Sequence, residues 1–287
     1  MPFSSPSHPA PFLTVRIRRD DLVPGLVGVC AGYELKTWRC QQLVSHLVQW
    51  LPEFALRHSE LAALGPHNAV EMVGRAAQVI YTSPKYKQRG EVGELLLHII
   101  LRQVFNTIPA ISKYFFKDAS NDTVKGFDAV HVVATATTLE LWLGEAKFYD
   151  DIGQAISKVI TSLQSHADRD YLRAEFAAIT NKIDDAWPHS ERLKKLIHPG
   201  TSLDEVFDAM CVPVLLTYDS PAIAAHESVT RAFQTAFENE VLAHRDTFAG
   251  KALPKKLRIH LFLLPMKAKA DLLAQFDAKL KTCQAIL

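Results

Sequence analysis

The first candidates for chemistry are two charged residues at the end of an apolar strand pattern. Alternate positions carry Leu139, Leu141 and Leu143, and the series continues with Glu145 and Lys147. Because strand side chains alternate between faces, these residues share one face. Charges on a buried face are costly unless they are paired or bind a metal. The pattern therefore predicts a functional carboxylate and lysine at the end of this strand.

Two other triplets place an acid two residues before a lysine, but in different contexts. Glu34 and Lys36 lie in a glycine-rich stretch with no apolar strand before them. Asp277 and Lys279 lie in a helical pattern, where residues two apart do not share a face. We interpret both pairs as solvated surface charges.

Asp128 is a second carboxylate on an apolar face, in an expected strand at residues 126–134. A hairpin between this strand and the strand at 139–149 could bring Asp128 beside Glu145. Carboxylate oxygens are hard ligands that suit Mg²⁺ or Mn²⁺. Lys147 could then position an attacking water or stabilise charge on a phosphate. The alternative is a structural cluster of ion pairs.

The helices expected on either side of these strands carry further candidates. The upstream helix has Glu91 and Glu94 on one face, three residues apart, and one of them could face the metal. The downstream helix has Gln154 and Lys158 near its N-terminus, an end that favours phosphate groups. The alternative for all four is an ordinary solvated helix residue.

A basic segment that contains Lys85, Lys87 and Arg89 precedes the upstream helix, with Tyr86 interleaved. Such a segment could contact a phosphate backbone, although a solvated linker would have the same composition. The sequence contains neither a glycine-rich P-loop nor the Gly-x-Ser-x-Gly elbow of serine hydrolases. P-loop ATP hydrolysis and this kind of serine hydrolase are therefore disfavoured.

The order of the expected elements indicates the fold class. Strands are expected over 12–18, 126–134, 139–149, 212–218 and 258–264, and helices over 44–51, 70–80, 91–105, 150–166, 169–210, 220–249 and 267–284. This alternation predicts an α/β fold with a mixed central sheet flanked by helices.

A polar, Pro/Gly-punctuated stretch separates two expected domains. We expect an N-terminal α+β subdomain over residues 1–88, of which 1–11 form a mobile tail. The second domain covers 89–287, with a helical insert at about 169–210.

Composition excludes several classes of protein. The chain has 287 residues, of which 48% are hydrophobic and 22% are charged, as in ordinary globular proteins. The formal net charge is +1, so any contact with nucleic acid must come from a local patch. The four cysteines include no Cys-x-x-Cys pair, which excludes a zinc ribbon. With no apolar run long enough for a membrane span, we expect a cytoplasmic protein.

Three segments resemble the HamA family of the PD-(D/E)XK nuclease superfamily. They are Arg-Gly-Glu-Val-Gly-Glu-Leu-Leu-Leu (89–97), Lys-Gly-Phe-Asp-Ala-Val-His (125–131) and Leu-Gly-Glu-Ala-Lys-Phe-Tyr (143–149). The resemblance covers roughly residues 85–270. It implies a restriction-endonuclease-like core with a metal-dependent deoxyribonuclease site. One departure is Phe127, which stands where the superfamily motif has proline.

On the family pattern, Asp128 and Glu145 would bind Mg²⁺ (or Mn²⁺), and Lys147 would be the catalytic lysine. Glu94, or less readily Glu91, would be the acid contributed by the helix. Gln154 would assist in the same site.

The resemblance also implies a biological setting. The family is the nuclease effector of the Hachiman anti-phage system, and its partner is HamB, a superfamily 2 helicase. We therefore expect DNA as the substrate and a HamB-like helicase as the controlling partner. The alternative is a non-catalytic adaptor that uses the nuclease fold to bind the helicase or DNA.

Overall fold

The computed structural model describes residues 8–80, 90–112 and 126–286. The strands are β1 (Thr14–Arg19), β2 (Gly25–Cys30), β3 (Tyr33–Glu34), β4 (Thr37–Trp38), β5 (Ile108–Pro109), β6 (Ala129–Ala134), β7 (Leu139–Phe148), β8 (Met210–Asp219) and β9 (Ile259–Met266). The helices are α1 (Cys40–Gln49), α2 (Leu51–Ala55), α3 (His58–Leu61), α4 (Ala69–Val79), α5 (Glu91–Phe105), α6 (Ile152–His166), α7 (Arg169–Thr180), α8 (Ser190–Leu196), α9 (Leu203–Asp208), α10 (Pro221–Ala224), α11 (Arg231–Ala249) and α12 (Lys269–Gln284). None of these helices is long and apolar enough to cross a membrane.

Seven strands form one mixed sheet in the order β1-β2-β9-β8-β7-β6-β5. The four central strands, β2, β9, β8 and β7, are parallel to one another, and the outer strands are antiparallel to their neighbours. Strands β8 and β9 are apolar on both faces, as parallel strands covered on both sides must be. The expected mixed α/β fold with a central sheet flanked by helices is confirmed.

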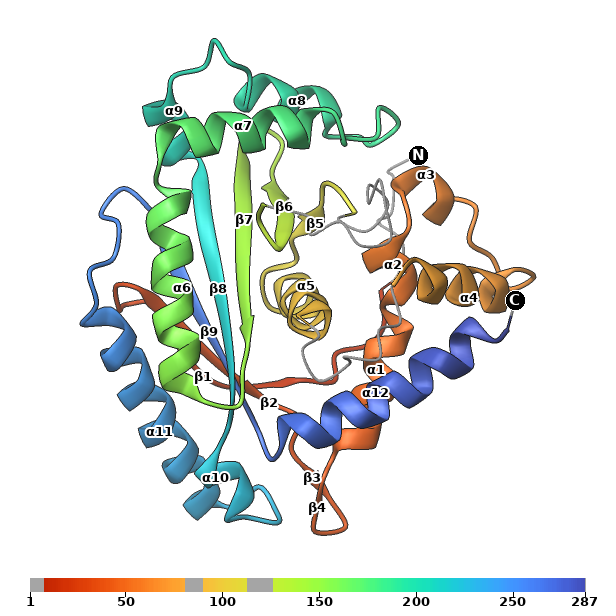
Figure 1. Ribbon diagram of the computed structural model, residues 1–287, viewed down its shortest axis with the longest axis vertical. Coiled ribbons are helices and arrows are strands. Elements are labelled where there is room, and N and C mark those ends of the chain that lie inside the picture. Colours follow the sequence, from red (N-terminus) through yellow and green to blue (C-terminus); the bar gives the residue numbers. More distant parts are fainter. Residues whose placement is uncertain (1–7, 81–89, 113–125, 287) are drawn as a thin grey trace.

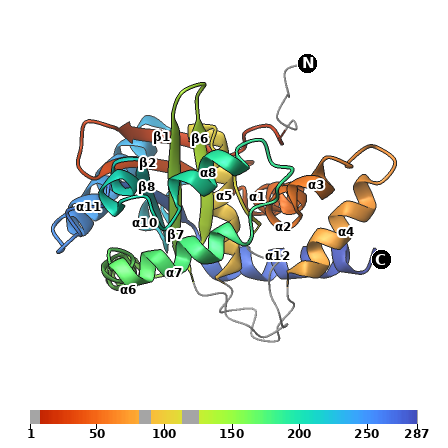
Figure 2. The same ribbon diagram turned by 90° about the horizontal axis from the view of Figure 1, so that it is seen from above.

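Helices cover both faces of the sheet, as Figure 1 and the view from above in Figure 2 show. Helices α6 and α11 lie on one face, and α5 lies on the other. Helix α5 lies so close to β7 that a Cβ added at Gly144 would be only 2.7 Å from Leu97 Cδ2. Beyond α5, α12 packs against α1 and α4. The site described below depends on this close contact between α5 and β7.

Several expected elements match the structure closely. Helix α5 has the expected bounds, and β6, β7, β8 and β9 each overlap an expected strand. The single helix expected over 220–249 is wrong, because the chain forms α10 and α11 instead. Ser220 Oγ accepts from the Ile223 N–H at the start of α10, and Thr230 Oγ1 accepts from Phe233 N–H at the start of α11. Thr230 itself has an extended backbone, so the chain leaves the helical conformation there and α11 begins as a new helix.

No strand is expected over Gly25–Cys30, yet the segment is the buried strand β2. Its Gly28 is needed for packing, because a Cβ there would lie 2.6 Å from Ile17 Cγ2 and 3.1 Å from Val241 Cγ1. Since β2 pairs with both β1 and β9, these first two strands belong to the same sheet as the later strands, whereas β3 and β4 form a separate two-stranded sheet. The boundary expected near residue 88 lies outside the described residues. So do residues 1–7, whereas His8 stacks on Trp50 with ring centroids 5.4 Å apart.

Candidate active site

The hairpin of β6 and β7 brings Asp128 beside Glu145. Ala129 pairs with Gly144 in antiparallel register, so Asp128, one residue earlier, lies across from Glu145. The Asp128 N–H donates to the Gly144 carbonyl over 2.8 Å. Its Oδ2 accepts from the Ala146 N–H, also over 2.8 Å. These two bonds fix the Asp128 carboxylate at the edge of β7, and the expected hairpin is confirmed.

Glu145 lies between Lys147 and His166 in the interior. Its side chain is 5% exposed, and its Oε1 accepts a hydrogen bond from Lys147 Nζ. Its Oε2 lies 3.7 Å from His166 Nε2, on the last turn of α6. Lys147 is 19% exposed, so the ion pair has one buried end and one end that reaches solvent.

Burial controls the protonation of this group. It raises the pKa of Glu145 to about 6, with a further increase from the charge on Asp128, against the lowering effects of Lys147 and of the hydrogen bond from Ser162. Burial also lowers the pKa of His166 to about 4, so the ring is neutral at pH 7. Asp128 and Glu145 thus repel one another, and a nearby cation would relieve that repulsion.

A cleft of about 480 Å³ opens next to these residues. It is lined by Gly90, Glu94, Asp128, Ala146, Lys147, Phe148, Tyr149 and Lys269. Glu94 comes from the first turn of α5, and Lys269 is the first residue of α12. The cleft lies outside the carboxyl end of β7, where ligands usually bind in open sheets with parallel strands.

The cleft brings together three of the residues predicted from sequence, Glu94, Asp128 and Lys147. Glu145 lies behind them, in contact with Lys147. Glu91 is half-buried, and the cleft lining includes Glu94 but not Glu91.

The remaining predicted residues lie elsewhere. Gln154 and Lys158 are exposed on α6 and do not line the cleft. The Gln154 N–H donates to the Asp151 carboxylate, which caps α6 and places a negative charge at that end of the helix. Lys85, Lys87 and Arg89 lie outside the described residues.

Asp128 and Glu145 are the residues best suited to hold a divalent metal. They offer hard oxygen donors and repel one another, and Mg²⁺ is often held by one or two carboxylates together with waters and substrate phosphates. Across the described ranges, no group of three or more His, Cys, Asp or Glu side chains is arranged to hold a metal ion. The donors therefore fit Mg²⁺ in type, and Glu145 would have to exchange Lys147 for the metal.

The sequence did not point to His166, Lys269 or the aromatic pair Phe148 and Tyr149. His166 is one helical turn after Ser162, so both reach Glu145 from the same face of α6. That spacing was the available signal for His166. Lys269 lies in the cleft only because α12 begins beside the end of β7, which no local pattern shows.

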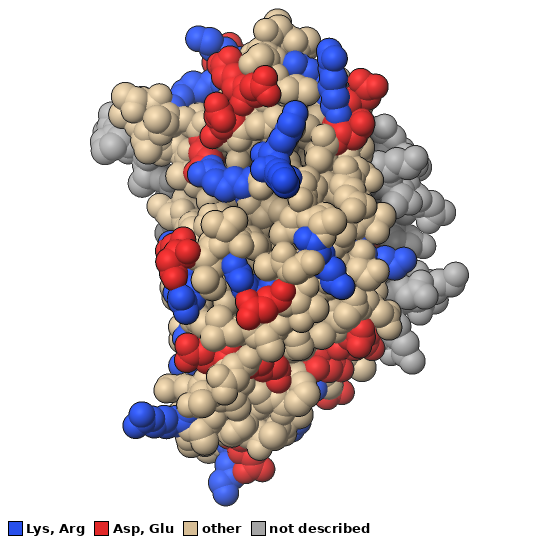
Figure 3. Space-filling model, turned by 90° about the vertical axis from the view of Figure 1, so that its left-hand side faces the viewer, with Lys and Arg blue, Asp and Glu red and all other residues tan. Residues whose placement is uncertain are grey.

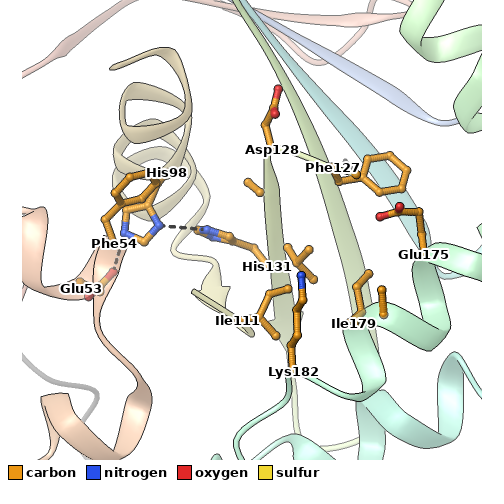
Figure 4. A pocket seen from close by; sticks show the side chains of 14 residues that line it. Glu53, Phe54, His98, Ile111, Phe127, Asp128, His131, Glu175, Ile179 and Lys182 are labelled. Carbon is orange, nitrogen blue, oxygen red and sulfur yellow. Dashed lines mark hydrogen bonds and ion pairs between the residues drawn. The ribbon is translucent and has the colours of Figure 1, made fainter. Parts of the chain in front are cut away.

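A second, smaller hollow of about 40 Å³ also has Asp128 in its lining (Figure 4). Its polar wall is a chain of contacts in which His98 Nδ1 lies 3.1 Å from His131 Nε2, and His98 Nε2 lies 3.1 Å from Glu53 Oε1. Arg102 Nε donates to the same Glu53 oxygen over 2.6 Å. The Asp128 carboxylate points away from the two histidines. This network joins α2, α5 and β6 and forms part of the wall of the hollow.

The fold and the cleft together define a mixed α/β protein with a carboxylate–lysine site at the carboxyl end of β7. The family model described as HamA matches residues 11–280, and the chain belongs to the HamA family. The chain is also 22% identical over 255 residues to Anti-bacteriophage protein A of Escherichia coli (strain K12). The match covers 87% of this chain and 46% of the relative, so the chain spans about half the length of that protein.

Proposed function

We propose that this chain is a metal-dependent deoxyribonuclease that acts in defence against phages. The observation that carries the proposal is the convergence of Glu94, Asp128 and Lys147 on one cleft, with Glu145 bound to Lys147. Carboxylates can hold a divalent metal that polarises a phosphate, and a neighbouring lysine can position a water or stabilise developing negative charge. The arrangement supports a PD-(D/E)XK restriction-endonuclease-like core within the mixed sheet.

Each residue of the site has a role in this proposal. Asp128 and Glu145 would hold Mg²⁺ (or Mn²⁺), with Glu94 as a further oxygen donor from α5. The bound metal would polarise the scissile phosphate. Lys147 would leave Glu145 and position the attacking water, with its charge placed to stabilise the phosphate as negative charge develops on it.

The biological setting rests on the family and on the named relative. HamA membership and the similarity to Anti-bacteriophage protein A support a role in anti-phage defence. The net charge is +1, and Figure 3 shows Lys and Arg interspersed with Asp and Glu over the face that carries α6 and α11. Such a protein would bind DNA weakly by itself. We therefore propose that a HamB-like superfamily 2 helicase delivers and controls it.

The test is cleavage of plasmid DNA in Mg²⁺ or Mn²⁺, with and without the helicase and ATP. The variant Glu145→Ala/Lys147→Ala should lose cleavage in every mixture. The matched control is Glu34→Ala/Lys36→Ala, which changes the same residue types at the tip of the β3–β4 hairpin and should cut like the wild type. Thermal melting of all three proteins checks that they are folded. Cleavage by the Glu145/Lys147 variant at the wild-type rate would disprove the site.

The closed contact between Lys147 and Glu145 is the observation that favours a second function, a non-catalytic adaptor. An adaptor can keep this pair as a structural ion pair and need not bind a metal. It would show no cleavage in any mixture and no thermal shift with Mn²⁺. The nuclease should show that shift and lose it in Asp128→Ala.

A further inference from the structure

Lys269 lines the same cleft as Glu94, Asp128 and Lys147, although it lies more than a hundred residues later in the chain. It is half-buried. Its Nζ lies 5.2 Å from the centroid of the Phe148 ring and 5.6 Å from that of Tyr149. The ring faces attract the cation and keep it at the end of β7. The cleft therefore contains a second lysine in a defined position.

The backbone around Lys269 is anchored at the carboxyl ends of β7 and β8. The Lys269 N–H donates to Asp219 Oδ1 over 2.7 Å, and the Asp219 N–H donates to the Asp150 carbonyl over 2.8 Å. Asp219 ends β8, and Asp150 lies in the turn after β7. The Asp219 carboxylate accepts the first N–H of α12 and places a negative charge at this helix terminus, so the group that offers positive charge to the cleft is the Lys269 side chain.

The charges of the cleft distinguish its two lysines. Lys147 is bound to Glu145. For Lys269, the described part of the chain provides two aromatic rings and no ion pair. The Lys269 charge acts on the nearby Asp219 carboxylate, which holds the Lys269 N–H, so the lysine stem and position are fixed although its Nζ forms no ion pair with a described residue. An anion that enters the cleft would complete its coordination with little loss of side-chain entropy.

We propose that Lys269 binds a backbone phosphate of DNA next to the phosphate that is cut. The inference rests on the proposed function, and it assigns Lys269 to substrate binding rather than to the chemical step. A phosphate that enters the cleft passes the carboxylates of Asp128 and Glu94, and the Lys269 cation in the same lining would attract it. A phosphate contact of this kind fixes the position of the strand and reads no base sequence.

The test compares Lys269→Met, which keeps the apolar stem over the rings, with Lys269→Arg, which keeps the charge. Lys267→Met is the matched control, because Lys267 is exposed two residues earlier and does not line the cleft. Binding of a short fluorescent DNA duplex to the full chain is measured in Ca²⁺ over a series of NaCl concentrations. Loss of one phosphate contact should reduce the slope of log affinity against log salt by about 0.9.

The expected result is that slope change and an increase in KM for Lys269→Met, with kcat and the melting temperature unchanged. Lys269→Arg and Lys267→Met should match the wild type. Equal slopes for the wild type and Lys269→Met, an equal loss in Lys267→Met, or a wild type that binds no duplex would overturn the inference. If the wild type binds through Lys269 but never cuts, the proposed nuclease fails and this phosphate site stands. If it cuts and Lys269→Met has the same KM, only this inference fails.

Discussion

At the scale of single residues, the site depends on which of two neighbouring acids faces the cleft. Glu91 and Glu94 lie in the first turn of α5, and only Glu94 lines the cleft. We expect Glu94→Gln to reduce the rate of DNA cleavage by about 100-fold, because it removes a carboxylate that is proposed to hold the metal. Glu91→Gln should stay within about twofold of the wild type, since it removes the same charge outside the cleft. The measurement is the initial rate of DNA cleavage in Mg²⁺. An equal loss in the two variants would contradict the assignment of Glu94 to the site.

The sequence could identify these acids but could not choose between them by geometry. Residues three apart on a helix share a face, so periodicity leaves both open. Which of the two faces the cleft depends on where β7 lies against α5. Asp128, Glu145 and Lys147 were predictable because they interrupt apolar strand faces, which is a local signal. Lys269 was not, because it reaches the cleft through the packing of α12.

At the scale of elements, Gly93 sets how closely α5 approaches β7. A Cβ at Gly93 would lie 2.8 Å from Phe148 Cβ, and that atom is part of a strand and cannot yield easily. We expect Gly93→Ala to destabilise the protein by about 1 to 3 kcal/mol and to reduce cleavage, because Glu94 would move away from Lys147. Because alanine is otherwise more favourable than glycine in a helix, the sign of the change in the free energy of unfolding tests the contact.

Gly90 provides the control for that substitution. It precedes α5 with ordinary helical dihedrals, and a Cβ added there meets no atom within 4 Å among the described residues. Gly90→Ala should therefore leave the free energy of unfolding in urea unchanged or slightly higher. A stabilised Gly93→Ala protein with full cleavage would show that α5 can shift at no cost.

The Glu53 network joins elements that are distant in sequence. Glu53 is 13% exposed and pairs with Arg102, which is 3% exposed. Burial opposes ionisation of Glu53, but the hydrogen bonds and charges of His98 and Arg102 outweigh it and lower its pKa to about 2. Glu53→Gln should destabilise the protein by about 3 kcal/mol at pH 7, because it leaves Arg102 buried without a counter-charge.

The pH dependence of that loss has a defined sign. A carboxyl group whose pKa is depressed on folding contributes stability above its ordinary pKa, and the contribution is lost as the pH falls toward the folded value. The difference between wild type and Glu53→Gln should therefore shrink between pH 4.5 and pH 2. Urea unfolding at pH 7 and pH 3 measures it. Asp185→Asn, which removes an exposed charge, is the control and should change stability by less than about 1 kcal/mol at both pH values.

At the scale of the whole molecule, the sheet contains more of the N-terminal segment than its sequence indicates. The two glycines of Gly25–Cys30 suggest turns, yet the segment is a buried strand because Gly28 makes room for Ile17 and α11. In a sequence, a glycine that is required by close packing cannot be distinguished from a glycine that is required by a turn. The strands from β6 onward were predictable since their apolar runs are continuous or alternate regularly.

We do not expect residues 89–287 to fold alone. Without residues 1–88, β9 would lose its partner β2, α12 would lose α1 and α4, and Arg102 would lose Glu53. An open edge on a central strand and a buried unpaired charge are both strongly unfavourable. We expect the fragment 89–287 to lack a cooperative urea transition and near-ultraviolet circular dichroism, and addition of fragment 1–88 to restore both. A cooperative transition of 89–287 by itself would show instead that the sheet closes without β1 and β2.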